Sequence, residues 1–236
     1  MCSLTWHHRQ NGYEVFFNRD EKKTRGRASP PAPGGKDGVR HLCPRDADAG
    51  GTWLLANEHG VTLALLNFWG DSDPDARPAR SRGLLLCDLL AAQSSASAVV
   101  KLLHDTSLEG YGSFTLAVFD LVGDQGPLVV RWNRGTLVSL PPAMPLCSSS
   151  FLPETVLDYR ERSFKALRDQ EPATLWNWHR REESPTACTV RMNRPDAQTW
   201  SSSRVSVTRD SILWHYVEEM PGLSAPPEEH EAILKL

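Results

Sequence analysis

Two short alternating segments at the start of the chain constrain the fold more than any other feature. Residues 2–6 and residues 13–17 both read as strands, and residues 7–12 between them form a turn sequence. Two strands joined by a tight turn form a hairpin, so the end of the second strand lies beside the start of the first. The residues just after the second strand are therefore expected next to Cys2.

The residues that this hairpin would bring together suit nucleophilic catalysis. Removal of Met1 is expected because the next side chain is small, and Cys2 would then carry a thiol and a free α-amine. Such an amine has a pKa of about 7.7–8.0 and can act as the general base for the thiol. Arg19 would favour the thiolate, and Asp20 would orient the amine. The alternative is that these charged residues form an ordinary solvated turn.

A second hairpin is expected over residues 52–67. Residues 52–56 are apolar, residues 57–60 read Asn-Glu-His-Gly, and the following run is aliphatic and β-branched. Asn67 ends this run, where its side-chain amide could donate to a developing oxyanion, an effect worth roughly 3–4 kcal/mol. The alternative is that Asn67 only ends the strand and starts a turn.

These segments together resemble the NRDE family, also called the transport and Golgi organisation family. The likeness rests on the opening Met-Cys-x-Leu-Thr-Trp, on Phe-Phe-Asn-Arg-Asp-Glu at residues 16–21, and on Gly-Gly-Thr-Trp-Leu, Asn-Glu-His-Gly-Val and Leu-Leu-Asn within residues 50–67. The same layout more distantly resembles the choloylglycine and penicillin V acylases, which are N-terminal nucleophile hydrolases.

The resemblance implies an α+β fold, a four-layer αββα sandwich of two antiparallel sheets flanked by helices, in one domain over residues 1–236. It implies catalytic roles for Cys2, Arg19, Asp20 and Asn67. The acylases also use a second Asn near mid-chain and a late Arg. The matching stretches here, residues 147–150 and 198–201, contain neither, and Arg204 is the candidate replacement for the late Arg.

Residues 19–51 read as a long loop rich in Gly, Pro and Arg. One interpretation is a solvated, mobile loop, and the other is a basic lid that attracts an anionic ligand. Three aromatic residues could wall an apolar pocket near the thiol. The predicted substrate-binding residues are Asn18, Arg25, Arg27, Trp53, Phe68 and Trp69.

The rest of the chain predicts strands, then helices, then strands, helices and strands again. This order suits two antiparallel sheets with helices outside. Helices are expected over residues 82–91, 94–104, 153–168 and 173–178, and strands over residues 114–120, 128–132, 136–140, 188–192, 204–207 and 212–217.

Composition narrows the function classes. The chain has 236 residues, which suits one large domain, and its formal charge of −3 gives no nucleic-acid signal. We expect no transmembrane segment, no signal peptide, no metal or cofactor motif, and a cytoplasmic location. Five scattered cysteines do not resemble a disulfide framework. The sequence carries no signal for the oligomeric state.

Two functional hypotheses follow. The first is an N-terminal cysteine amidohydrolase that cleaves a non-peptide C–N bond of a small acyl amide through an acyl-enzyme on Cys2. The second is a non-catalytic carrier that binds acyl-CoA, lipid or heme in the same pocket. Cys43-Pro44, close to His41, resembles heme-responsive Cys-Pro dipeptides.

Overall fold

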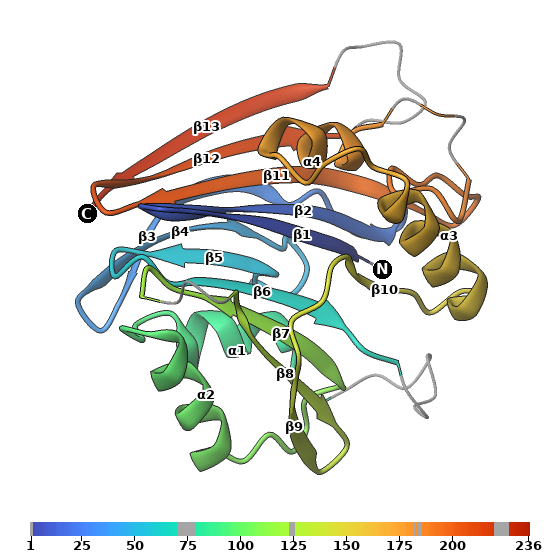
Figure 1. Ribbon diagram of the computed structural model, residues 1–236. Helices are drawn as coiled ribbons and strands as arrows, with labels where there is room; N and C mark the ends of the chain where they lie inside the picture. Colours follow the sequence, from blue (N-terminus) through green and yellow to red (C-terminus); the bar gives the residue numbers. More distant parts are fainter. Residues whose placement is uncertain (1, 70–78, 123–125, 182, 184–185, 220–226) are drawn as a thin grey trace.

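Two antiparallel β-sheets stacked face to face form the centre of the protein (Figure 1). The computed structural model describes residues 2–69, 79–122, 126–181, 183, 186–219 and 227–236. The strands of the first sheet, in spatial order, are β10 (Leu146–Ser148), β1 (Cys2–Arg9), β2 (Gly12–Lys22), β11 (Ala197–Thr208), β12 (Ser211–Glu218) and β13 (Glu228–Lys235). Those of the second are β3 (Ser29–Lys36), β4 (Val39–Arg45), β5 (Leu54–Asn57), β6 (Thr62–Asn67), β7 (Phe114–Phe119), β8 (Leu128–Asn133) and β9 (Thr136–Leu140).

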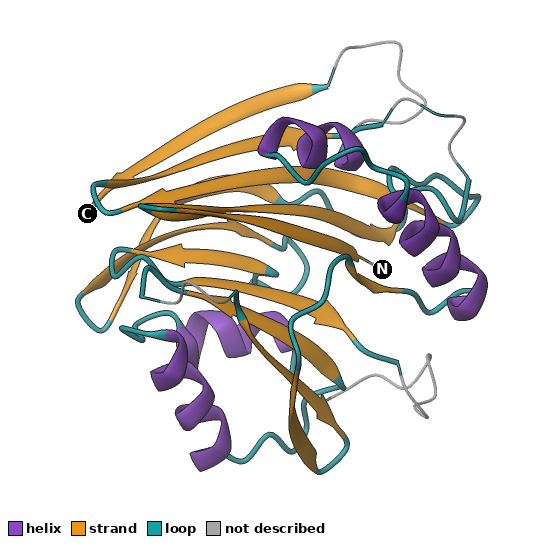
Figure 2. Cartoon of the chain, viewed as in Figure 1, coloured by secondary structure: helices purple, strands orange, loops and turns teal. Residues whose placement is uncertain are grey.

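Helices cover the outer face of each sheet (Figure 2). The second sheet is covered by α1 (Arg82–Leu85), which continues into the π-helical turn η1 (Leu86–Leu90), and by α2 (Ala96–Asp105). The first sheet is covered by α3 (Pro153–Lys165) and α4 (Pro172–His179). The expected four-layer αββα arrangement is therefore confirmed. None of the described helices is both long and apolar enough to cross a membrane.

Strict alternation along β1 and β2 separates the two faces of the first sheet. Leu4, Trp6 and Phe17 point into the central core between the sheets, whereas Phe16 packs under the helices. The predicted hairpin is confirmed, with Cys2 directly opposite Arg19 in the antiparallel register. Cys2 belongs to the central core, so Arg19 shares its inward face.

The segment after β2 differs from the expected loop. Residues 29–45 form the β3–β4 hairpin at the edge of the second sheet. Pro31 and Pro33 argued against a strand, because proline cannot donate to a ladder, but an edge strand tolerates it. The predicted strand over residues 188–192 is not formed, because Thr189 closes a turn with Thr186 by donating to its carbonyl.

A buried histidine joins α4 to the first sheet. His179 is fully buried, with Nδ1 3.0 Å from Asn18 Oδ1 and Nε2 2.9 Å from Thr5 Oγ1. These partners suit a neutral ring that donates from Nδ1 and accepts at Nε2. Burial, together with the positive charge of Arg160, lowers the pKa of His179 to about 3. The fold therefore requires the neutral imidazole.

This histidine makes stability depend on pH. The pKa of His179 is lower in the folded protein than the unfolded value of about 6.5, so the unfolded chain binds the extra proton first. The free energy of unfolding should fall by about 1.4 kcal/mol per pH unit from this group as the pH drops from 6.5 toward 3.

Thermal unfolding of the wild type and of His179→Gln between pH 7.5 and 4.5 measures this dependence. The free energy of unfolding should fall less steeply with decreasing pH in His179→Gln than in the wild type. His104→Gln is the matched control, because His104 is exposed on α2. Equal slopes for the wild type and His179→Gln would contradict the role of the neutral ring.

Candidate active site

Cys2 lies between two strands at the start of β1. Arg19 is its partner on β2, and Ser148 is its partner on β10. Cross-strand partners project to the same face of a sheet, so all three side chains face the second sheet. The predicted neighbourhood of Cys2 and Arg19 is confirmed, and Ser148 joins it from a short strand that sequence analysis did not find.

The Cys2 thiol is buried, with only 6% of the residue exposed. Burial raises the pKa of Cys2 to about 11, although the Asp20 backbone N–H and the Arg19 charge act in the opposite direction. Arg19 favours the thiolate as expected, because its charge lowers the pKa, but desolvation outweighs this effect in the folded chain. At neutral pH the sulfur carries its proton. Met1, whose removal would free the amine, lies outside the described residues.

Arg19 is held by partners of its own. Its guanidinium donates to Asp46 at 2.7 Å and stacks over Trp53, 4.3 Å from the ring centre. Arg25 also binds Asp46 with two hydrogen bonds of 2.9 Å. The ion pair with Asp46 compensates the charge of Arg19, which explains why its effect on Cys2 is small.

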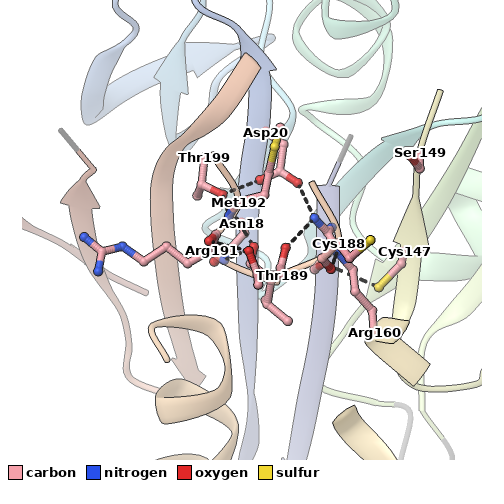
Figure 3. A network of polar contacts seen from close by, with 12 residues as sticks. Asn18, Asp20, Cys147, Ser149, Arg160, Cys188, Thr189, Arg191, Met192 and Thr199 are labelled. Carbon is pink, nitrogen blue, oxygen red and sulfur yellow. Dashed lines mark hydrogen bonds and ion pairs between the residues drawn. The ribbon is translucent and has the colours of Figure 1, made fainter. Parts of the chain in front are cut away.

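Asp20 follows Arg19 in β2, so alternation turns its side chain to the opposite face of the sheet. Figure 3 shows its contacts there. Its carboxylate accepts a 2.6 Å hydrogen bond from the Thr199 hydroxyl and forms a 3.0 Å ion pair with Arg160. Both side chains of this ion pair are completely buried. Asp20 therefore stays close to the Cys2 backbone while its orientation is fixed from β11 and α3.

The arginine that binds Asp20 is Arg160, which sequence analysis did not single out. It also donates to Ser3 Oγ at 2.8 Å and to the Thr189 carbonyl at 2.9 Å (Figure 3). Arg204 instead binds Glu14 at 2.6 Å, three register positions away from Cys2 along β2.

One signal for Arg160 was present in the sequence. Arg160 stands midway between Val156 and Phe164, the buried positions of α3. A charged residue at the spacing of a helix core face indicates a buried partner.

Ser148 is the unsatisfied donor nearest in register to the thiol. Its Oγ is buried and has no hydrogen-bond partner among the residues that the structure describes. Leaving a buried hydroxyl unpaired costs roughly 1–3 kcal/mol, which is the kind of cost seen at sites that bind a ligand. The Cys-Ser-Ser-Ser stretch thus offers a hydroxyl where the acylase pattern has an Asn side chain.

Asn67 ends β6, which packs against β1 and β10 across the central core. Ala64 and Leu66 face that core, so alternation turns the Asn67 side chain to the helix-covered face. The side-chain amide is therefore not directed at Cys2.

The backbone of Asn67 offers a different donor. The next N–H, of Phe68, donates to β7 at the Ser113 carbonyl, so the Asn67 N–H points to the other side. Among the residues that the structure describes, it has no hydrogen-bond partner. Sequence analysis predicted an oxyanion role for the side-chain amide of Asn67, whereas the register leaves its backbone N–H as the donor that is open.

Three predicted substrate-binding residues have structural partners instead. The Asn18 amide is fully used on the outer face, where it donates to the carbonyls of His179 and Val190. Arg25 is paired with Asp46, and Arg27 with Glu218. A basic lid formed by Arg25 and Arg27 is therefore not supported, because nearby carboxylates compensate both charges.

The three aromatic candidates lie under arginines. Trp53 is buried beneath Arg19, Phe68 lies 4.1 Å from the Arg131 guanidinium carbon, and Trp69 lies 5.5 Å from that of Arg82. The indole N–H groups of Trp53 and Trp69 are buried and have no hydrogen-bond partner within the described part of the chain.

Arg82 is a cation near the thiol that sequence analysis did not single out. Burial lowers its pKa, while Glu21 and Cys2 act on it in the opposite direction, which places it close to both. It donates to the Ser113 carbonyl at 3.0 Å. No carboxylate of the described residues forms an ion pair with it, so its charge is available to an anionic ligand.

One group of described residues has the spacing of metal ligands. Ligand atoms of Glu218, Glu228 and His230 lie within 4.8 Å of one another. Arg27 forms ion pairs with both glutamates, however. A guanidinium already supplies the positive charge that a metal ion would bring, so we assign no metal there.

Comparison with known proteins agrees with this geometry. A model of the family described as Transport and Golgi organisation 2 matches residues 1–215. No curated protein matches the sequence.

Solved structures show the same fold. The N-acylethanolamine-hydrolyzing acid amidase ortholog of Caenorhabditis elegans superposes with a TM-score of 0.60 at 13% identity, over 86% of this chain and 92% of that chain. Two variants of the conjugated bile acid hydrolase from Clostridium perfringens give TM-scores of 0.55 and 0.56 at 12% and 13% identity, over 100% of this chain and 96% of each of those chains. At such identities these likenesses establish an N-terminal nucleophile hydrolase-like fold.

The buried ion pair allows a direct test of how the site is held. Arg160→Met leaves the Asp20 carboxylate buried without its cation, which should cost about 3–5 kcal/mol in the free energy of unfolding. Arg162→Met on the same helix is the control, because its pair with Asp158 is exposed and should contribute less than about 1 kcal/mol. Urea unfolding compares the two variants, and similar losses for both would contradict the proposed importance of the Asp20–Arg160 pair.

Proposed function

The chain belongs to the Transport and Golgi organisation 2 family, and we propose that it is an N-terminal cysteine amidohydrolase that cleaves a non-peptide C–N bond. The observation that carries this proposal is the position of Cys2 between Arg19 and Ser148, with the Asp20 N–H in contact with its sulfur. The fold shared with an N-acylethanolamine-hydrolyzing acid amidase and a conjugated bile acid hydrolase supports it.

Because the pKa of Cys2 is raised, the reaction needs a base that removes the thiol proton. A buried, protonated thiol is a poor nucleophile until a base removes its proton in the same step. After loss of Met1, the free amine of Cys2 is the base attached to the nucleophile itself. Its ordinary pKa of about 7.7–8.0 leaves part of it unprotonated at neutral pH. Asp20, fixed by Arg160 and Thr199, orients this amine.

The chemical steps then balance. The amine takes the thiol proton as the sulfur attacks the amide carbonyl, which forms a C–S bond and an oxyanion. When the oxyanion collapses, the C–N bond breaks and the leaving nitrogen takes the proton from the ammonium. Water, deprotonated by the same amine, then attacks the thioester and releases the acid with the thiol restored.

The oxyanion requires donors that are already in place. The Ser148 hydroxyl is buried, unpartnered and directly opposite Cys2. The Asn67 N–H is the second candidate, since it points away from β7 and has no partner among the described residues. Donors that are fixed before the reaction stabilise the developing charge without reorganisation.

A carrier is the second candidate function. It is favoured by the same raised pKa, because a buried protonated thiol is suited to contact a ligand without reacting. In that case the protein would hold an acyl-CoA, a lipid or heme beside Cys2 without turnover. The two functions differ in whether the Cys2 sulfur is required.

The central experiment uses protein whose intact mass shows that Met1 is absent. A panel of N-acyl amides should be hydrolysed, with a burst of amine release that Cys2→Ala abolishes. Ser148→Ala should lower kcat by about 10–1,000-fold with little change in KM, because the hydroxyl acts on the transition state. Ser139→Ala, an exposed strand serine on β9, should behave as the wild type.

The outcomes separate the two functions. No hydrolysis of any amide, together with acyl-CoA or heme binding that is unchanged in Cys2→Ala, would reject the enzyme in favour of the carrier. Hydrolysis that persists in chains retaining Met1 would exclude the free amine as the base.

Charge selectivity tests the role of Arg82. We expect Arg82→Gln to raise KM about tenfold for acyl amides that bear a carboxylate, because a charge-assisted hydrogen bond contributes roughly 1.5–3 kcal/mol. KM for a neutral amide of the same shape should stay nearly constant. Arg80→Gln is the matched control, since Arg80 is exposed and stacks on Tyr111. An equal change in KM for both amides would show that Arg82 does not recognise the substrate carboxylate.

A further inference from the structure

A second pair of reactive groups lies on the other side of the second sheet from Cys2. Cys43 on β4 faces the helix-covered core, and Cys87 is a buried residue of η1. The two thiols are in hydrogen-bonding contact. Both are free cysteines, 44 positions apart in the sequence, and the proposed hydrolysis uses neither of them.

A close crossing of two backbones brings these cysteines together. A β-carbon on Gly51 would lie 2.5 Å from the Gly83 carbonyl carbon, and one on Gly83 would lie 2.8 Å from the Thr52 backbone. Glycine at both positions lets α1 start directly against residues 50–53. Cys87 follows one turn later, where Thr52 contacts both sulfurs.

Arg45 makes the pKa values of the two thiols differ. Its Nη1 lies 2.8 Å from Cys87 Sγ. The hydrogen bond donated by Cys43 and the Arg45 charge together lower the pKa of Cys87, despite its burial. The same hydrogen bond, with burial, raises the pKa of Cys43. One sulfur is thus prepared to act as a thiolate and the other to keep its proton.

Cys87 is also the more accessible of the two thiols. Cys87 is 7% exposed and Cys43 only 1%, so a small molecule reaches Cys87 first. Asp88, the next residue, is exposed, and Arg45 is half-buried. A single π-helical turn is also a less regular structure than an α-helix and is frequent at functional sites.

We propose that Cys43 and Cys87 form a peroxide-reactive dithiol site, with Cys87 as the attacking sulfur and Cys43 as the resolving one. The substrate class is a small hydroperoxide. This site is separate from the proposed hydrolytic centre and does not depend on it.

The reaction balances in two steps. The Cys87 sulfur attacks the terminal oxygen of the hydroperoxide and forms an S–O bond, the O–O bond breaks, and the thiol proton leaves with the alcohol or water. Cys43 then attacks the sulfenic sulfur, a disulfide forms, and the hydroxyl departs with the Cys43 proton as water. The peroxide is reduced by two electrons that the two thiols supply, and an external dithiol restores them.

The other cysteines lack this arrangement. Burial raises the pKa of Cys2 and that of Cys147, whose thiol contacts Ser3. Cys188 is more exposed, but among the described residues it has no second sulfur paired with it. These three thiols therefore serve as internal references.

The test treats the reduced full-length protein with hydrogen peroxide near equimolar amounts. Unreacted thiols are then alkylated and the protein is digested without reduction. We expect a peptide that joins Cys43 to Cys87 and a return to the free thiols with dithiothreitol. Cys43→Ser should leave a sulfenic acid on Cys87 that dimedone captures, and Cys188→Ser should still form the disulfide.

Arg45→Met supplies a second readout that keeps both cysteines. It should slow disulfide formation about fivefold to tenfold, because the thiolate loses its cation. Arg40→Met on the same strand is the control, since Arg40 binds Glu58. This rate comparison and the wild-type linkage decide the proposal even if a cysteine variant fails to fold.

Two results would overturn the proposal. One is oxidation of Cys2 or Cys188 while both Cys43 and Cys87 remain free to be alkylated. The other is further oxidation of Cys87 to a sulfinic acid while Cys43 stays a thiol.

Discussion

The buried ion pair between Asp20 and Arg160 is the interaction on which the candidate active site depends. Two charges with fully buried side chains are costly to desolvate, and they are tolerated because Ser3, Thr189 and Thr199 supply the remaining hydrogen bonds. The pair joins α3 to β2, and Thr199 adds β11. The start of β1, where Cys2 lies, is thereby held on its outer side by a network that has little freedom to move.

The protein places its cysteines in two contrasting electrostatic settings. Around Cys2, burial outweighs the adjacent Arg19, because that arginine is already paired with Asp46. Around Cys87, burial is outweighed by a hydrogen bond from Cys43 and by Arg45. A neighbouring cation thus activates a thiol only when no carboxylate compensates it, which is why the first site requires a base and the second does not.

The local sequence pattern was enough to predict many of the strands and helices. The β7–β9 meander matches the three strands predicted over residues 114–140, and α2 begins at Ser95, whose side chain accepts from the Ala98 N–H as expected of a cap. The three edge strands that sequence analysis missed share one cause. β3 contains prolines, β10 is only three residues long, and β13 is largely polar, so each forms because a neighbouring strand offers an edge rather than because its own sequence favours a strand.

The sequence by itself determined the register that pairs Cys2 with Arg19, because alternation and a tight turn leave one arrangement for a hairpin. Only the tertiary structure decided which groups complete the two sites. Arg160 reaches Asp20 across 140 positions, Ser148 reaches Cys2 from the edge of the sheet, and Cys87 reaches Cys43 across a glycine crossing. Such contacts depend on how whole layers pack, and local periodicity carries no information about a partner that lies far away in the chain.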